Sequence, residues 1–478
     1  MFKSKVLRVR RIVQLRNFVI YFFGAGKVSL QIWHLLNTEL FSLNGKRFRA
    51  KWDIVKHMPD YLINSTSPIN SRAIVDFSPL DLDFEEKNRT LHIANEKYQS
   101  GDWAQADSLL KEVAQIHKRA QVRLGSETIN LRLIGSEITQ SIGHMAVALG
   151  PRARFKQMGV TSDNYVVLAG KVANRFYLNL WQSHFPILEV SPLQVEITER
   201  TLWPLVESVQ QMPVNGMNLN MYRAHNRSIV ESEAMGFDPL LRYPDEFMER
   251  SHKFLSRYGF KKGDWFVALH VREGNFDKPG YGRNADISTY IDAINEISKR
   301  GGYVIRLGDL NSKPLPKMKN LIDLTAGIRP EWLDVFCLSQ CVFLIGTTSG
   351  PLVVPNTFGV PILATNAPDL KRFAYYPNSL LLPKLVNDLR RDRLLTLQEI
   401  LDSRAGVSDG WLDAQRHGLS WRANTPGEIT SAVIEMLESS HYELTAKQKA
   451  IRSLMSSELG PSTPIAETFV QAHPEVFN

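Results

Sequence analysis

The chain has 478 residues, 44% of them hydrophobic, which is enough for two or three domains with apolar cores. Its formal net charge at pH 7 is +8, but residues 1–38 supply seven of these charges and contain no acidic residue. The other 50 basic and 49 acidic residues nearly cancel, which argues against a nucleic-acid-binding protein, because such a protein needs a basic face on its folded domains.

The basic N-terminal segment mixes lysines and arginines with large apolar residues. Its longest apolar run, 18–25, is far shorter than the ~20 residues that span a bilayer. Basic and apolar residues in such a mixture are typical of a segment that lies on an anionic membrane surface. We therefore predict a membrane-proximal segment and linker over 1–60, with membrane contacts through 3–27. The alternatives are a helix that packs on the rest of the protein and an unstructured lead-in.

We expect a cytoplasmic protein that is peripheral on the inner face of the cell membrane. The chain has only two cysteines, Cys337 and Cys341, in an apolar helical stretch, where they are expected to be small core residues. Two cysteines provide neither a disulfide framework nor a zinc site.

A helical hairpin is predicted over 61–125. Apolar residues recur at helical spacing from 88 to 122, with a break at Gly101-Asp102-Trp103, as in one tetratricopeptide-type (TPR-like) unit. A single unit of this type cannot bury its own apolar face, so the hairpin should dock on a neighbour or bind a protein partner. Just before it, Asp81-Leu82-Asp83 spells the D-x-D pattern by which some sugar transferases hold a metal. We interpret it as an acidic turn before a helix and predict no metal site.

A first α/β unit is predicted over 126–243, with strands at 130–134, 165–169 and 186–190 and a helix over 172–184. Ser141-Ile142-Gly143-His144 opens another helix after the first strand. This order places His144 at a helix N-terminus, where backbone N–H groups can face an anion or a sugar hydroxyl. The alternative is that His144 only caps the helix or packs.

A second α/β unit, over 244–440, begins with a linking helix over 244–258. Its first strand, 265–271, has six apolar residues out of seven, as expected for a strand buried on both faces of a parallel sheet. His270 and Arg272 lie at the end of this strand, where open α/β sheets bind their ligands. The loop that follows, 275–282, has two glycines, a proline and two aromatic residues and is typical of a mobile lid.

Further strands are predicted at 303–307, 320–324, 342–345 and 360–363, the last of which closes the set. Strands that alternate with helices indicate a parallel sheet. Asp286 stands where the N-cap of the next helix belongs. Arg306 lies mid-strand among apolar residues, so it must pair internally or face the cleft.

The turn Gly346-Thr347-Thr348-Ser349-Gly350 places two glycines and three hydroxyls between a strand and a helix, which allows a close approach to phosphate. It is neither G-x-G-x-x-G nor a Walker sequence, which argues against dinucleotide and ATP sites. The region 388–418 is charged and loop-like. A capping box at 425–428 opens a helix through 437, and 441–478 holds a last helix, about 445–456, and a tail.

His270-Val271-Arg272-Glu273-Gly274 resembles the H-x-R-x-G signature of the fucosyltransferase-like group, which covers α-1,6-fucosyltransferases, nodulation fucosyltransferases and protein O-fucosyltransferases. Leu307-Gly308-Asp309 and the segment 343–350 fall at two further motifs of that group. Together with Ile142-Gly143-His144 and Arg283-Asn284-Ala285-Asp286, the pattern over 128–440 is similar to a family of bacterial GT-B glycosyltransferases. Some fucosyltransferases have a guanine-reading acidic residue where this chain has Val342, which argues against GDP-fucose.

The resemblance implies an α/β fold of GT-B type, with two Rossmann-like domains facing a cleft. It implies an inverting, metal-independent transfer of a hexosyl or deoxyhexosyl group from a nucleotide-sugar donor, without a cofactor. In that group the arginine contacts the donor diphosphate, which assigns that role to Arg272. The donor-site candidates are His270, Arg272, Arg283, Gly308, Asp309, Thr347, Thr348, Ser349 and Gly350. The catalytic candidates are Arg272 and, as general bases, His144, Asp286 and Asp277.

The predicted function is therefore sugar transfer to a glycan or lipid-linked acceptor in cell-surface polysaccharide synthesis. Two alternatives belong to other classes. A nucleotide-sugar epimerase also uses paired α/β domains but has no need of a membrane-binding segment. A non-catalytic scaffold, built on the hairpin with a degenerate transferase domain, would have no reason to keep His270, Arg272 and the hydroxyl-rich turn.

Overall fold

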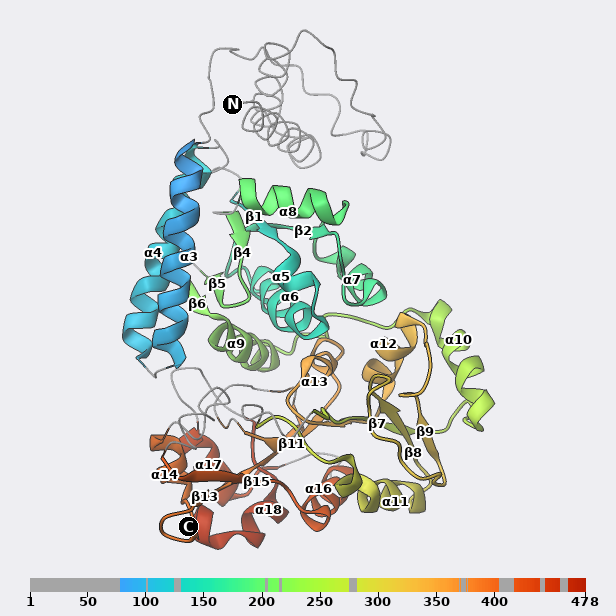
Figure 1. Ribbon diagram of the computed structural model, residues 1–478. Coiled ribbons are helices and arrows are strands. Elements are labelled where there is room, and N and C mark those ends of the chain that lie inside the picture. Colours follow the sequence, from blue (N-terminus) through green and yellow to red (C-terminus); the bar gives the residue numbers. More distant parts are fainter. Residues whose placement is uncertain are drawn as a thin grey trace.

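The computed structural model describes residues 78–99, 102–123, 130–202, 205–214, 217–274, 282–368, 370, 375, 377–403, 417–438, 443–455 and 463–478. The predicted basic segment and residues 275–281 of the predicted lid lie outside these ranges. The described residues form a helical hairpin and two parallel α/β sheets in separate halves of the molecule, with a smaller antiparallel sheet near the C-terminus (Figure 1). The predicted α/β class with parallel sheets is thus confirmed. No helix within these ranges is long and apolar enough to cross a membrane.

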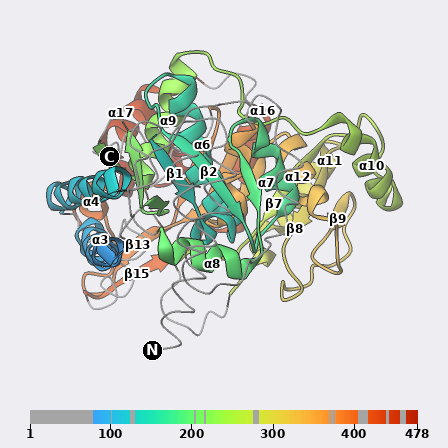
Figure 2. The same ribbon diagram turned by 90° about the horizontal axis from the view of Figure 1, so that it is seen from above.

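The hairpin consists of α3 (Ser78–Gln99) and α4 (Trp103–Arg123), which lie side by side along one side of the molecule (Figure 1, Figure 2). Because α3 already begins at Ser78, the D-x-D residues 81–83 lie within a helix, and the predicted turn before a helix is wrong. The two helices bury a small apolar cluster, which consists of Leu91, Ala94, Leu110 and Val113.

The hairpin also docks on the first sheet and its neighbours. The Asn218 side chain donates to the carbonyl of Leu110 at 3.0 Å, and the Gln121 side chain donates to the carbonyl of Leu131 at 3.3 Å. The prediction that the hairpin docks on a neighbour is therefore confirmed. Its TPR-type identity and a protein partner stay predictions.

The first sheet is parallel, in the order β3-β2-β1-β4. Its strands are β1 (Leu131–Ile134), β2 (Asn164–Ala169), β3 (Ile187–Glu189) and β4 (Val206–Glu207). The first three correspond to the three predicted strands, whereas β4 is too short to show a periodic pattern in the sequence. An antiparallel pair lies beside it, β5 (Gln211–Val214) and β6 (Met217–Asn220).

The helices around the first sheet are α5 (Ser136–Thr139), α6 (Ile142–Gln157), α7 (Arg175–Leu180), α8 (Pro192–Thr201) and α9 (Met221–Ala234). The helix predicted over 172–184 begins only at Arg175, because Asn174 caps it: its side-chain oxygen accepts from the Tyr177 backbone N–H at 2.7 Å. The predicted linking helix is present as α10 (Asp245–Leu255).

The second sheet is also parallel, in the order β12-β11-β10-β7-β8-β9. Its strands are β7 (Phe266–His270), β8 (Tyr303–Leu307), β9 (Leu321–Asp323), β10 (Leu344–Gly346), β11 (Ile362–Ala367) and β12 (Leu380–Pro383). The prediction that the strand at 360–363 closes the set is wrong, because β12 pairs beyond it. The intervening helices include α11 (Ile291–Lys299), α12 (Glu331–Gln340) and α13 (Gly350–Val353).

The C-terminal part is more ordered than its sequence indicates. The region predicted as a loop, 388–418, contains β14 (Arg393–Leu394) and α14 (Leu397–Asp402), and two strands border it, β13 (Leu385–Asp388) and β15 (Leu419–Arg422). The three strands form an antiparallel sheet, so this prediction is wrong for the residues described.

The predicted capping box is confirmed at α16 (Pro426–Glu438), where Thr425 and Glu428 exchange two side-chain-to-backbone hydrogen bonds. The predicted last helix is α17 (Ala446–Met455). Beyond it, the tail forms α18 (Glu467–Ala472) and α19 (Pro474–Phe477) and buries Phe469 and Phe477.

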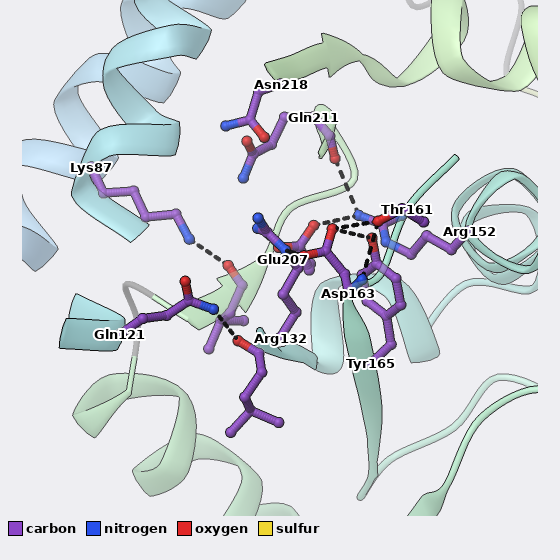
Figure 3. Close-up of polar contacts among 12 residues, drawn as sticks. Lys87, Gln121, Arg132, Arg152, Thr161, Asp163, Tyr165, Glu207, Gln211 and Asn218 are labelled. Carbon is purple, nitrogen blue, oxygen red and sulfur yellow. Dashed lines mark hydrogen bonds and ion pairs between the residues drawn. The ribbon is translucent and has the colours of Figure 1, made fainter. Parts of the chain in front are cut away.

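Charged side chains are buried beneath the first sheet (Figure 3). We call Arg132, Arg152, Asp163 and Glu207 the buried charge cluster. Glu207 pairs with Arg132 at 3.0 Å and with Arg152 at 2.7 Å, and Arg132 also pairs with Asp163 at 3.0 Å. Nearby, the Lys87 ammonium of the hairpin donates to the carbonyl of Val206. Burial alone would raise the pKa of Glu207, but the two guanidinium groups lower it to about 2. The cluster therefore joins α6 to the first sheet through compensated charges.

Candidate functional site

The candidate site lies where the first and second halves of the molecule touch, at the N-terminal end of α6 and the turn after β10. Gly143 and Gly350 face each other there: a Cβ built on Gly143 would lie 2.5 Å from the Cα of Gly350. Any side chain at Gly143 would therefore collide with the backbone of Gly350, whereas a Cβ on Gly350 would lie 3.2 Å from the Gly143 nitrogen, a tight contact. The contact brings the predicted residues His144 and Thr347–Gly350 to one place, although more than 200 positions separate them in the sequence.

The turn after β10 is fastened to the end of β7. The Thr347 backbone N–H donates to the carbonyl of His270 at 3.2 Å, and the Thr347 hydroxyl accepts from the Arg272 backbone N–H at 2.7 Å. Thr347 is fully buried, so its hydroxyl shapes the site from beneath. Thr348 and Ser349 are half-buried, which leaves part of each accessible. The two strands that carry the turn and Arg272 are neighbours in the sheet.

His270 lies beneath the same turn, with its Nδ1 3.1 Å from the Ser349 hydroxyl oxygen. Burial is the main cause that lowers the pKa of His270 to about 4, and the charges of Arg329 and Arg272 act in the same direction. The ring is therefore neutral near pH 7 and supplies hydrogen bonding, not positive charge.

The Arg272 guanidinium is half-buried and donates through Nε to the side-chain oxygen of Asn284 at 3.2 Å. Asn284 itself is buried and packs so closely on Gly274 that a Cβ there would lie 2.3 Å from the Asn284 amide nitrogen. The segment after the predicted lid therefore positions Arg272. Arg283, next to Asn284 in the chain, is half-buried.

A second cation reaches the same asparagine. The Lys384 ammonium donates to the backbone carbonyl of Asn284 at 2.8 Å. The sequence analysis missed Lys384, because it follows β12, a strand that was not predicted. We refer to Arg272, Asn284 and Lys384 as the edge group.

The residue after Arg272 is anchored by an internal ion pair. Arg306 of β8 is buried and pairs with Glu273 at 2.7 Å and with Asp323 at 2.9 Å. Glu273 also accepts from the Lys313 backbone N–H at 3.2 Å. This confirms the first of the two alternatives predicted for Arg306, which pairs internally.

Gly308 and Asp309 follow β8 at the same edge of the sheet and make a local turn. The Gly308 carbonyl accepts from Arg329 at 2.7 Å, and the Asp309 carboxylate accepts from the Asn311 backbone N–H at 2.8 Å. A donor-binding role for these two residues stays a prediction. Val342 precedes β10 and is half-exposed, so it lies at the opposite end of that strand from the turn.

His144 is held in one orientation by the helix before it. Its Nδ1 lies 2.9 Å from the Glu137 backbone carbonyl, which can only accept, so Nδ1 carries the hydrogen. In the neutral ring the lone pair is then on Nε2. Ser141 caps α6 by accepting from the His144 backbone N–H at 3.4 Å.

His144 lines a depression of about 460 Å³ at the carboxyl edge of the first sheet. The other lining residues are Ser136, Glu137, Gln140, Ser141, Glu199 and Val206. Hydroxyl, amide and carboxylate groups predominate, and this is the chemistry that binds polyhydroxylated molecules.

Asp286 has a structural task. Its carboxylate accepts from the Ser288 backbone N–H at 3.0 Å and lies 3.8 Å from the Lys313 ammonium. The hydrogen bond from Ser288 lowers the pKa of Asp286, which makes it a weaker base. Asp277, the remaining base candidate, lies outside the described residues.

Comparison of the chain with known protein families finds no match, and comparison with curated proteins finds no relative. Among solved structures, the glycosyl transferase family 9 protein from Veillonella parvula DSM 2008 is similar at 11% identity and a TM-score of 0.36, over 53% of this chain and 86% of that one. The ADP-heptose LPS heptosyltransferase II of E. coli is similar at 12% identity and a TM-score of 0.35, over 54% and 90%. The E. coli heptosyltransferase WaaC with ADP has 11% identity and a TM-score of 0.30, over 53% and 93%. This similarity is too low to assign a function to the chain, and the resemblance to the fucosyltransferase-like group stays a prediction.

Proposed function

We propose that the protein is a GT-B glycosyltransferase that moves a sugar from a nucleotide-sugar donor to a glycan or lipid-linked acceptor. One observation carries the proposal: Gly143 and Gly350 are in contact, and on either side of them lie the sheet edge with Arg272 and the polar depression lined by His144. Transfer between two substrates needs such a pair of neighbouring sites.

On the donor side, Arg272 and the turn at 347–350 bind the diphosphate. The guanidinium group and the hydroxyls of Thr348 and Ser349 stabilise the negative charge that develops as the sugar–diphosphate bond breaks. Neutral His270 supports the turn through Ser349. Val342, at the other end of β10, takes no part in this site.

On the acceptor side, the acceptor hydroxyl enters from the depression beside His144. Its oxygen forms a bond to the anomeric carbon while the bond from that carbon to the diphosphate oxygen breaks. The hydroxyl proton moves to His144 Nε2, and the leaving diphosphate takes the electron pair. A single displacement of this kind inverts the anomeric configuration. Of the described base candidates, His144 lines the depression and has Nε2 available, whereas Asp286 caps a helix.

A thermal-shift screen with GDP, UDP, ADP, dTDP and CMP tests the donor site. We expect at least one nucleotide to raise the melting temperature, because a ligand at 100 times its Kd stabilises the folded state by about 2.7 kcal/mol. The variant His144→Ala should keep this shift and lose sugar transfer by about 10²-fold or more. A screen in which no nucleotide shifts the melting temperature contradicts the proposal. Release of a new sugar without any acceptor would indicate an epimerase.

A further inference from the structure

Lys384 lies at the same sheet edge as Arg272 and the turn after β10. It follows the last residue of β12, and its backbone N–H donates to the carbonyl of Ala367, the last residue of β11, at 2.9 Å. Since all strands of this sheet are parallel, their carboxyl ends lie at one edge. Lys384 is therefore positioned by the sheet itself and not by a surface loop.

The Lys384 side chain is half-buried, and its ammonium group faces a neutral partner. Its hydrogen bond goes to a neutral carbonyl, that of Asn284, and no carboxylate pairs with it among the residues that the structure describes. The charged neighbours of Asn284 in the chain are Arg283 and Asp286, and Asp286 is engaged with Ser288 and Lys313. The carbonyl of the preceding residue, Pro383, accepts from the neutral Asn424 side chain at 2.8 Å.

An ammonium group that loses part of its hydration without gaining a counter-ion costs free energy, so its presence needs a reason. In the buried charge cluster, carboxylates compensate the two guanidinium groups of Arg132 and Arg152. At the edge group, by contrast, Arg272 and Lys384 approach the two oxygens of one asparagine from its side chain and its backbone. An anion beside Asn284 would meet both cations.

We propose that Lys384 is the second cation of the diphosphate site and holds the donor diphosphate together with Arg272. This inference rests on the proposed function and deepens it. An ammonium group has three hydrogens, of which the Asn284 carbonyl takes one. Two remain for phosphate oxygens, and the ligand supplies the negative charge that Lys384 does not find among the described residues.

The inference predicts a pH dependence. Burial lowers the pKa of Lys384 to about 8, below its ordinary 10.5, so the free protein loses this proton as the pH rises through 8. A diphosphate binds the protonated form, and its affinity should therefore fall between pH 7 and pH 9.5. Arginine stays charged over this range, so Lys384→Arg should remove the pH dependence. Lys384→Met should bind weakly at every pH.

Calorimetric titration with inorganic pyrophosphate tests this directly, with the strongest nucleotide of the thermal-shift screen as a second probe. At pH 7 we expect Lys384→Met to lower the affinity by about 10- to 100-fold, as for the loss of a hydrogen bond to a charged group. The matched control is Lys319→Met, since Lys319 is exposed and precedes β9 at the opposite edge of the sheet. Lys384→Met should also melt no lower than the wild type, because it removes an uncompensated buried charge.

The outcomes separate the two proposals. If the wild type and Lys384→Met bind pyrophosphate and the nucleotide equally, at pH 7 and at pH 9.5, while Arg272→Ala binds weakly, then the donor site stands and the role of Lys384 is wrong. If the wild type binds neither probe, both proposals fail. A Lys384→Met variant that melts well below the wild type contradicts the absence of a compensating partner and thereby the inference.

Discussion

The buried charge cluster and the edge group both contain cations that are at least partly buried, but the partners of these cations differ. In the cluster, Glu207 accepts from Arg132 and Arg152, so carboxylates within the protein compensate the guanidinium groups. In the edge group, Arg272 and Lys384 donate to the neutral oxygens of Asn284. The cluster is complete by itself and its task is structural. In the edge group no carboxylate among the described residues pairs with the Lys384 ammonium, and we propose that a bound anion takes that place. This difference distinguishes the binding site from the scaffold.

The largest effect on stability is expected where the compensation is broken. Glu207→Ala leaves Arg132 and Arg152 buried without their shared carboxylate and should lower the free energy of unfolding by about 3–5 kcal/mol. Urea unfolding followed by circular dichroism measures this. The control is Glu189→Ala, which breaks the exposed pair with Arg175 and should cost about 1 kcal/mol or less.

Glu207→Ala should lower stability without affecting the binding of pyrophosphate. At temperatures where Glu207→Ala is still folded, its affinity for pyrophosphate should equal that of the wild type, because the cluster takes no part in binding. Equal stability of Glu207→Ala and Glu189→Ala would contradict a structural role of the cluster.

A smaller effect is expected at the contact between the two halves. Gly143→Ala places a methyl group against the backbone of Gly350, so one of the two segments must move. We expect a loss of about 1–3 kcal/mol, as for overpacking elsewhere, together with slower sugar transfer. Thermal melting and a transfer assay measure the two effects.

Gly150→Ala, in the same helix, is the matched control. A Cβ at Gly150 would meet only a Leu240 methyl carbon at 3.9 Å, an ordinary contact. Alanine should therefore be tolerated there or should stabilise α6 by up to about 1 kcal/mol. If Gly143→Ala had the same melting temperature and transfer rate as Gly150→Ala, the close contact would contribute to neither stability nor transfer.

Much of the fold could be predicted from local patterns. The apolar run before Arg272 predicted β7 because a strand buried on both faces has no polar position. The capping box at Thr425 predicted the start of α16 because its hydrogen bonds are local. By contrast, β12 and β13 have only four residues each and are separated by a single lysine, within a charged and proline-containing segment. Strands this short give little periodic signal.

The residues of the candidate site were likewise predictable only where a local pattern marks them. Arg272, His144 and the turn at Thr347 were found because each stands next to a strand or helix that was itself predictable. Lys384 was missed along with its strand. The sequence could not show that Thr347 faces inward, because this depends on the pairing of β10 with β7. Nor could it show that Gly143 meets Gly350, because this depends on how the two halves of the molecule are placed.

The role of Arg272 at the diphosphate is tested most directly by the turnover of Arg272→Ala, measured as release of the nucleoside diphosphate from the nucleotide-sugar donor. We predict a loss of about 10²–10³-fold in kcat/KM. We also predict an unfolding free energy within about 1 kcal/mol of the wild type, since the side chain gives up a hydrogen bond to Asn284 at a half-buried position. The control Arg300→Ala, which removes an exposed ion pair on α11, should leave turnover unchanged. Undiminished turnover by a folded Arg272→Ala would contradict the assignment of this sheet edge as the diphosphate site.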